Sequence, residues 1–350
     1  KLGSPRKSVR KKVAPPKLGA WEHASLEAIV GGSDPGFREI PGPDSLERLD
    51  ADYGYGWYKV ELSNARSGQP FAPEMGDRLH FYVDGKLQEV MGFGPGAVDG
   101  PTDLRLGDAA VLLADNLGRF NYGQRTGEEK GLFGHLYAVK PVKLPKAKVV
   151  EERSADPFEV TGYVYHRRRG DLPISQTFTW ELKGDPRLPI VVELNGDLKG
   201  TLLLNGKPFA VYMGSQSAMQ QRWTLRVGEH GWVGGKNQLK LSLLAPPPAK
   251  VDPQRQVKLY QATATLTDGR WWFRPWGVPE ASSYGKLPRT LVSQPAWFRT
   301  TFTVADASVP LWIEPRGMTK GQLYLNGHNL GRYFVATRDK KRVPPQQRYY

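Results

Sequence analysis

The stretch Leu323-Tyr324-Leu325-Asn326-Gly327-His328 consists of three strand-forming residues, an Asn-Gly pair and a polar residue. The same pattern occurs as Leu-Leu-Leu-Asn-Gly-Lys at 202–207 and as Phe-Tyr-Val-Asp-Gly-Lys at 81–86. An Asn-Gly or Asp-Gly pair supplies the positive φ angles that a two-residue hairpin turn requires. Each third of the chain is therefore expected to hold one tight β-hairpin, and tandem copies of a related unit account best for the repeat.

The sequence around these hairpins alternates between apolar and polar residues. Residues 79–83, 177–182 and 299–304 are examples, and they are rich in β-branched and aromatic side chains. A period of two with such residues indicates half-buried strands. Only residues 45–52 are compatible with a short helix. The sequence therefore predicts an all-β chain built from two-layer sandwiches.

Proline-rich and basic segments mark three boundaries. Residues 1–17 hold seven Lys or Arg and no acid, which predicts a solvated basic arm, and residues 141–148 and 245–253 have the composition of linkers. The remaining blocks have the size of one sandwich each. The predicted sandwiches are 18–145, 150–247 and 254–350.

Composition excludes several classes of function. The 350 residues contain no Cys, which removes disulfides, thiolate metal sites and Cys nucleophiles. No apolar run reaches the ~18 residues that would suggest a transmembrane helix. The net charge is +14, and half of it lies in residues 1–17. Such a charge favours anionic partners, and the arm suggests an anionic membrane surface as one of them.

Longer strings carry a resemblance to a known family. Residues 317–334, GMTKGQLYLNGHNLGRYF, resemble a hairpin of the β-sandwich domains in glycoside hydrolase family 35 β-galactosidases. Residues 53–58, 116–123 with 130–132, and 17–21 resemble further segments of the same domains. The resemblance covers nearly the whole chain from about residue 17 and implies tandem jelly-roll, galactose-binding-like sandwiches. It also implies one or two further strands that would close the third sandwich.

The resemblance transfers no catalytic residue. In that family the two catalytic carboxylates lie on an α/β barrel, and no such barrel is visible in this sequence. A retaining glycosidase needs two carboxyl groups ~5 Å apart on a rigid scaffold. We therefore expect a protein with no catalytic centre of its own, unless the chain is part of a longer hydrolase.

The most unusual stretch of the sequence runs from 271 to 276. Trp271, Trp272, Arg274 and Trp276 are candidate ligand-binding or partner-binding residues. Indole rings stack on the apolar faces of sugars, and Trp and Arg are enriched at protein-binding hot spots. A place in the core at a domain junction is the alternative.

Four further residues belong to the hairpin strings. Arg119 and Arg332 each follow a Gly and could bind a carboxylate or a sugar hydroxyl, or could brace the turn through backbone carbonyls. Asn326 and His328 flank the third turn and could present its loop to a ligand. The structural alternative for Asn326 is the turn itself.

Metal, cofactor and nucleic-acid functions receive little support. The six His residues are scattered without ligand spacing, and no EF-hand-like loop is present, so no cofactor is expected and Ca²⁺ is a weak alternative. Basic clusters at 166–169 and 338–342 lie outside any recognisable nucleic-acid reader, which disfavours nucleic acid as a partner.

Three functions remain open. The first is a carbohydrate-associated binding module, expected to be periplasmic or secreted although no signal peptide is visible. The second is a structural or accessory subunit that docks on a larger protein assembly, for which a membrane surface is one possible place. The third is the C-terminal part of a β-galactosidase-like hydrolase. Fold alone does not decide among them.

Overall fold

The three Asx-Gly hairpins share the same turn and the same irregularity. The turn Asx residues Asp84, Asn205 and Asn326 have φ angles of 49°, 50° and 49°, and each is followed by a Gly with positive φ. In each hairpin the register shifts two residues before the Asx, which marks a β-bulge at the same place. The predicted hairpin repeat is confirmed. The hairpins are β7 (Arg78–Val83) with β8 (Lys86–Gly92), β15 (Lys199–Leu204) with β16 (Lys207–Met213), and β23 (Lys320–Leu325) with β24 (His328–Phe334).

The computed structural model describes most of the chain, and its strands confirm the all-β, tandem-sandwich prediction. Within the described residues the helical turns are α1 (Glu27–Val30), α3 (Pro253–Gln256) and the 3₁₀ turn η1 (Ala281–Ser283). The short helix expected at 45–52 is wrong, because residues 46–50 form turns that follow a strand. The described residues are 14–63, 68–104, 106–119, 121, 126–156, 174–214, 221–290, 292–306, 308–315, 318–338 and 341–343.

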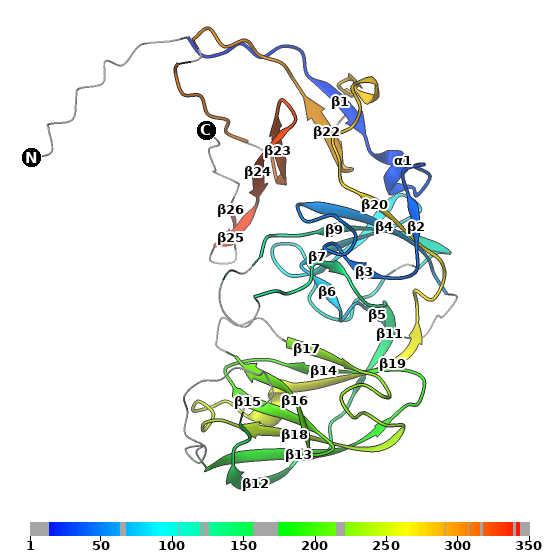
Figure 1. The fold of residues 1–350 in the computed structure, drawn as a ribbon, viewed down its shortest axis with the longest axis vertical. Helices are drawn as coiled ribbons and strands as arrows, with labels where there is room; N and C mark the ends of the chain where they lie inside the picture. The colour runs from blue at the N-terminus through cyan, green and yellow to red at the C-terminus, as the bar shows by residue number, and fades with distance from the viewer. Residues whose placement is uncertain are drawn as a thin grey trace, which may run out of the picture.

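The first sandwich is built on a six-stranded antiparallel sheet, which we call sheet 1 (Figure 1). One face of sheet 1 packs on a core that includes Tyr58, Leu79, Phe81, Leu112 and Phe273. A three-stranded sheet of β3 (Asp44–Ser45), β10 (Gly131–Leu132) and β6 (Met75–Gly76) lies over that core. The strand order in sheet 1 is β2 (Arg38–Ile40), β20 (Trp271–Pro275), β4 (Tyr55–Glu61), β9 (Ala109–Asp115), β7 and β8.

A five-stranded sheet, sheet 2, links the first and second sandwiches. Its central strand β19 contributes Val257 and Leu259 to the second core, and Leu266, directly after the strand, belongs to the first core. The strand order is β17 (Gln221–Leu225), β14 (Ile190–Leu194), β19 (Val257–Thr265), β11 (Tyr137–Val142) and β5 (Gln69–Phe71). Strand pairing therefore crosses the boundary at 254 that the proline-rich segment predicted.

Sheet 3 completes the second sandwich. Its inner face supplies Phe178, Trp180, Leu239 and Leu241 to a core that it shares with one half of sheet 2. In Figure 1 this unit lies at the end of the molecule remote from the N-terminal strand. The strand order is β12 (Lys148–Arg153), β13 (Ile174–Gly184), β18 (Gly235–Leu243), β15 and β16.

The two chain ends meet in a third unit, which we call the terminal unit. Strand β1 (Glu22–Ser25) lies between β21 (Gly285–Lys286) and β22 (Ala296–Arg299). The hairpin β23–β24 and the small pair β25 (Ala336–Arg338) and β26 (Lys341–Val343) follow. Residues 1–13 of the predicted arm and the basic cluster 166–169 lie outside the described residues.

Candidate functional site

The face of sheet 1 that points away from the first core carries the candidate site. Side chains of a strand alternate between its two faces, so Trp57 and Tyr55 of β4, Tyr82 of β7 and Leu113 of β9 point outward. They form a separate buried cluster with Trp297 of β22 and with Tyr324 of the hairpin β23–β24. The terminal unit therefore covers this face rather than leaving it to solvent.

A buried ionic junction lies at one end of the same face. Asp115 closes β9, and its side chain is fully buried. The Arg332 guanidinium donates to Asp115 Oδ1 at 2.5 Å and to the Asn116 carbonyl at 2.5 Å. The Lys320 ammonium lies 3.7 Å from Asp115 Oδ2. One carboxylate of the first sandwich thus faces two cations of the hairpin, and Arg332 also lies 5.1 Å from the Tyr55 ring centroid.

His80 on β7 completes this junction. The Lys320 ammonium donates to His80 Nε2 at 2.5 Å, which requires a neutral imidazole with its proton on Nδ1. Burial, together with the positive charges of Lys320 and Arg78, holds the pKa of His80 well below its usual range. Burial also lowers the pKa of Lys320 to about 8, although the neighbouring Asp115 acts in the opposite direction. The junction is therefore a place where a change of pH alters charge.

A second buried pair holds described residues of the strings at 116–123 and 130–132. Lys130 is fully buried and donates to both oxygens of Asp77, at 2.8 and 2.9 Å, and to Glu128 at 2.5 Å. Asp77 Oδ2 also accepts from the Leu117 amide at 2.8 Å. Lys130 and Leu117, which are 13 positions apart in the sequence, therefore both bind the Asp77 carboxylate. These contacts hold the start of the turn after β9 in place.

The structure places Arg119 in this same structural turn. Its guanidinium pairs with Glu47 and also reaches the Asp52 carbonyl at 3.4 Å. Glu47 in turn accepts from the Lys130 amide at 3.1 Å. The geometry matches the bracing role that was one of two alternatives for Arg119, and Arg332 likewise contacts backbone carbonyls as well as Asp115.

The aromatic run at 271–276 is divided between the two faces of β20. Trp271 is 2% exposed in the first core and donates from Nε1 to the Thr267 carbonyl at 3.2 Å. Trp272 points to the other face, where the Lys59 ammonium and the Arg270 guanidinium lie 4.9 and 5.2 Å from its ring centroid. Trp271 and Trp272 therefore do not form one binding surface.

Arg274 and Trp276 also contact the protein's own groups. Arg274 donates to Asp34 at 2.8 Å. The Trp276 ring stacks on Trp297 at a centroid distance of 5.2 Å and lies 4.7 Å from Tyr55. Trp276 thus belongs to the interface between sheet 1 and the terminal unit, close to Arg332, which fits the domain-junction alternative.

Asn326 and His328 lie at the tip of the third hairpin. Both are exposed, and Asn326 adopts the left-handed conformation of the turn. The structure does not bring them together with Trp271, Trp272 or Arg274. Sequence reasoning missed Asp115, His80, Lys320 and Lys130. Their positions in the sequence could have pointed to two of them. Asp115 directly precedes the string at 116–123, and Lys320 lies within the stretch 317–334 that resembles the β-galactosidase hairpin.

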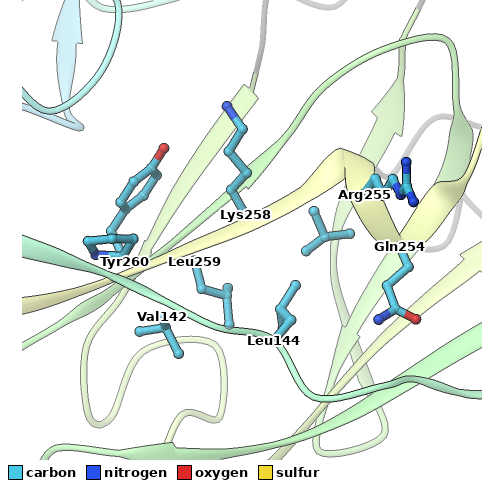
Figure 2. Close-up of a pocket in the computed structure, with 9 residues that line it drawn as sticks. Val142, Leu144, Gln254, Arg255, Lys258, Leu259 and Tyr260 are labelled. Atoms are coloured by element: carbon cyan, nitrogen blue, oxygen red, sulfur yellow. The ribbon is translucent and has the colours of Figure 1, made fainter.

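Figure 2 shows a groove of about 270 Å³ beside β19 and the linker after β11. Its floor is apolar, and its polar side chains contact the protein itself. Lys258 pairs with Glu193 at 3.1 Å, Arg255 with Asp252 at 3.3 Å, and Gln254 donates to the Pro145 carbonyl at 3.4 Å. This groove lies where α3 and β19 meet the linker after β11, and nothing in it is arranged to bind a ligand.

Neither a metal cluster nor a membrane-spanning helix occurs among the residues that the structure describes. No group of three or more His, Asp or Glu side chains in those ranges could hold a metal ion. None of the helices in the same ranges has the length and apolar composition to cross a bilayer.

Comparison with known families identifies two segments of the chain. Residues 43–143 match the family described as the first all-beta domain of beta-galactosidase, and residues 295–350 match its galactose-binding domain. The chain resembles the β-sandwich domains of β-galactosidases. The ionic junction therefore joins two β-galactosidase-type segments, because Asp115 lies in the first match and Lys320 and Arg332 lie in the second.

Solved structures show weaker similarity. The chain is 11% identical to a beta-glucuronidase from Bacteroides uniformis, with a TM-score of 0.25, and the match covers 65% of this chain and 28% of that one. A calcium binding mutant of beta-glucuronidase 2 from the same organism is 13% identical, with a TM-score of 0.24 and coverage of 72% and 32%. A GH31 alpha-xylosidase from Xanthomonas citri is 12% identical, with a TM-score of 0.16 and coverage of 75% and 25%. The chain spans about a third or less of the length of these structures.

Proposed function

We propose that this chain is a non-catalytic, carbohydrate-binding β-sandwich assembly of the β-galactosidase type. The observation that carries the proposal is the junction of Asp115 with Lys320 and Arg332, because it fastens a first all-beta segment to a galactose-binding segment. An extracytoplasmic location, periplasmic or secreted, belongs to the same proposal. No cofactor is part of it.

The buried state of the aromatic run supports a rigid scaffold. Trp271 fills a core and Trp276 is stacked within an interface, so both stabilise the assembly rather than reach a ligand. Carbohydrate would then contact surfaces other than Trp271 and Trp276. In this proposal the sandwiches position a sugar-binding surface, either in an independent binding protein or beside the catalytic part of a hydrolase.

Isothermal titration of the full chain tests the proposal. The ligands are galactosides, a neutral galactan and acidic polysaccharides, at concentrations up to millimolar. We expect saturable binding to at least one of them. The absence of binding to every ligand would overturn the proposal.

A hydrolysis assay separates binding from catalysis. The full chain is incubated with an aryl β-galactoside at enzyme concentrations in the micromolar range. We expect no turnover above the buffer control. Turnover that follows the protein through purification would show that the chain carries a catalytic centre after all.

A further inference from the structure

Two of the hairpin turns contain an Asn-Gly pair in the same backbone conformation. Asn205 and Gly206 have φ angles of 50° and 80°, and Asn326 and Gly327 have φ angles of 49° and 83°. In an Asn-Gly pair the backbone nitrogen of the Gly can attack the side-chain amide of the Asn, because no Gly side chain hinders the approach. A difference in reactivity between the two turns must therefore come from the surroundings of the Asn side chain.

The structure holds the Asn205 side chain by hydrogen bonds at both ends of its amide group. Nδ2 donates to the Gly231 carbonyl at 2.8 Å and to Asn237 Oδ1 at 3.0 Å. Oδ1 accepts from the Gln238 amide at 2.8 Å. The side chain must break these bonds before its carbonyl carbon can turn toward the Gly206 nitrogen.

The Asn326 side chain is held by no such bonds. Asn326 and Gly327 are exposed, and in the described ranges no hydrogen bond reaches the side-chain amide of Asn326. A Cβ atom on Gly327 would meet nothing within 4 Å, and the same is true of Gly206. Open space is thus common to both turns, whereas freedom of the Asn side chain is found only at 326.

A third Asn-Gly pair, at 195–196, is also held in place. Asn195 is half-buried, its Nδ2 donates to Glu193 at 3.4 Å, and its backbone amide donates to the Gln256 carbonyl at 3.0 Å. The Gly196 carbonyl accepts from the Tyr212 hydroxyl at 2.8 Å. The sequence has no other Asn-Gly pair. Two restrained pairs therefore serve as internal controls for the free one.

We propose that Asn326 is a site of spontaneous deamidation. The Gly327 nitrogen attacks Cγ of Asn326 and forms a carbon–nitrogen bond. The side-chain nitrogen takes up the proton of the Gly327 amide and leaves as ammonia, so the product is a cyclic succinimide. Water then opens the succinimide at one of its two carbonyl groups. The final products are aspartate and isoaspartate at position 326, and each adds one negative charge.

The two products differ in their effect on the hairpin β23–β24. Aspartate suits the turn, because Asp84 occupies the same place in the first hairpin with a φ angle of 49°. Isoaspartate adds a methylene group to the main chain within the two-residue connection between Leu325 and His328. The added atom changes the geometry that a two-residue turn requires. Isoaspartate should therefore loosen the tip of the hairpin, and aspartate should leave it intact.

Incubation of the full chain at 37 °C, at pH 6.0 and pH 8.5, tests the site. Proteolysis and mass spectrometry then measure deamidation at each Asn-Gly pair over time. Because a restrained side chain must first break hydrogen bonds, Asn326 should react about tenfold faster than Asn205 and Asn195. The reaction should be faster at pH 8.5, since the attacking nitrogen must lose its proton. Equal rates at the three pairs, or an intact Asn326, would overturn the proposal.

The same incubation in 8 M urea separates the fold from the local sequence. Unfolding removes the hydrogen bonds of Asn205 and Asn195, so all three pairs should then react at similar rates. A preference for Asn326 that persists in urea would assign the effect to the flanking residues and would also overturn the proposal.

Amide hydrogen exchange tests the consequence for the hairpin. The isoaspartate form, separated from the incubated chain by chromatography, should exchange faster in residues 323–330 than the parent chain. Freshly purified Asn326→Asp carries the same charge without the added methylene group and should exchange like the parent. Equal exchange in the isoaspartate form and in Asn326→Asp would contradict the effect assigned to the altered main chain.

Discussion

Asp115 is a fully buried carboxylate that faces two cations lying more than 200 positions away in the sequence. Arg332 donates to it at 2.5 Å, and Lys320 lies within 3.7 Å. A buried ion pair contributes little compared with an apolar contact, but removal of one partner leaves an uncompensated charge. The junction is therefore sensitive to single substitutions on the hairpin.

The first prediction concerns Arg332. Arg332→Ala should destabilise the terminal unit by about 3–5 kcal/mol, because it leaves Asp115 buried without its closest cation. Denaturant unfolding followed by tryptophan fluorescence measures the change, since Trp297 and Trp276 lie in the same interface. Arg289→Ala is the control, because Arg289 is exposed, and it should change stability by less than ~0.5 kcal/mol. Equal effects of the two variants would contradict the role given to the junction.

The second prediction concerns His80 and acid. The folded state keeps the pKa of His80 well below its usual range, so below about pH 6.5 the unfolded chain binds a proton that the folded chain does not. Protonation thus favours unfolding, and the stability of the terminal unit should fall as pH drops below that value. Thermal unfolding between pH 7 and pH 5 measures it. His80→Gln should reduce this dependence, and an unchanged pH profile would show that His80 is not responsible.

Lys320 should act at the opposite end of the pH range. Its pKa is lowered to about 8, so between about pH 8 and 10.5 the folded chain binds fewer protons than the unfolded chain. The contribution of Lys320 to stability should therefore rise with pH across that interval. Unfolding of Lys320→Met at pH 7.5 and pH 9.5 should show a smaller rise than the parent chain shows. A rise that survives the substitution would assign the effect to other groups.

At the scale of elements, the hairpin β23–β24 depends on close contact with the loop before β4. Gly54 has a φ of +77°, and a side chain there would overlap the Gln322 amide of β23. Gly85 has a similar φ of +69°, but a Cβ atom there would meet nothing within 4 Å. Both glycines thus need a positive φ angle, but only Gly54 also packs against the hairpin β23–β24.

This pair of glycines gives the next prediction. Gly54→Ala and Gly85→Ala should both cost about 1 kcal/mol in backbone strain. Only Gly54→Ala should also loosen the hairpin, which faster amide hydrogen exchange in residues 320–334 would report. Equal exchange in the two variants would mean that the hairpin does not depend on contact with Gly54.

Some of the secondary-structure elements could be predicted from the sequence and others could not. The three Asx-Gly turns were predictable because the turn is a local property of two residues. A place in the core at a domain junction was one alternative for the run at 271–276, but nothing within the run indicates which strand lies beside it. The insertion of β20 between β2 and β4, more than 200 residues away, therefore left no local signal.

The candidate site was harder to predict than the fold for a related reason. Charged residues in strands normally point to solvent, and Lys320 or Asp115 alone gives no sign of burial. Their role appears only when the hairpin packs on sheet 1. Of the eight residues singled out from the sequence, the structure places Arg332 and Trp276 at this interface, whereas Trp271, Arg119 and Asn326 serve the core or the turns.

For the whole molecule, the shared sheet couples the first and second sandwiches. Strand β19 pairs with β14 of the second sandwich and with β11 of the first, and Arg226 and Arg222 pair with Glu74 and Asp99 across the same boundary. The terminal unit has no strand in that sheet. Calorimetry should therefore show the two sandwiches unfolding in one transition, with the terminal unit unfolding separately at lower temperature. Separate transitions for the two sandwiches would contradict the coupling.

The net positive charge of the sequence lies toward its two ends. Residues 1–17 and 285–350 together have 18 Lys or Arg and three Asp or Glu, whereas residues 18–284 have 31 Lys or Arg and 32 Asp or Glu.

Titration of the full chain with carbohydrate tests the central claim most directly. Isothermal calorimetry with a neutral galactan, simple galactosides and polygalacturonate covers the ligand classes that the proposal allows. We expect saturable binding of at least one of these ligands by the folded chain. Absence of heat and of saturation with all of these ligands at millimolar concentration would contradict a carbohydrate-binding function.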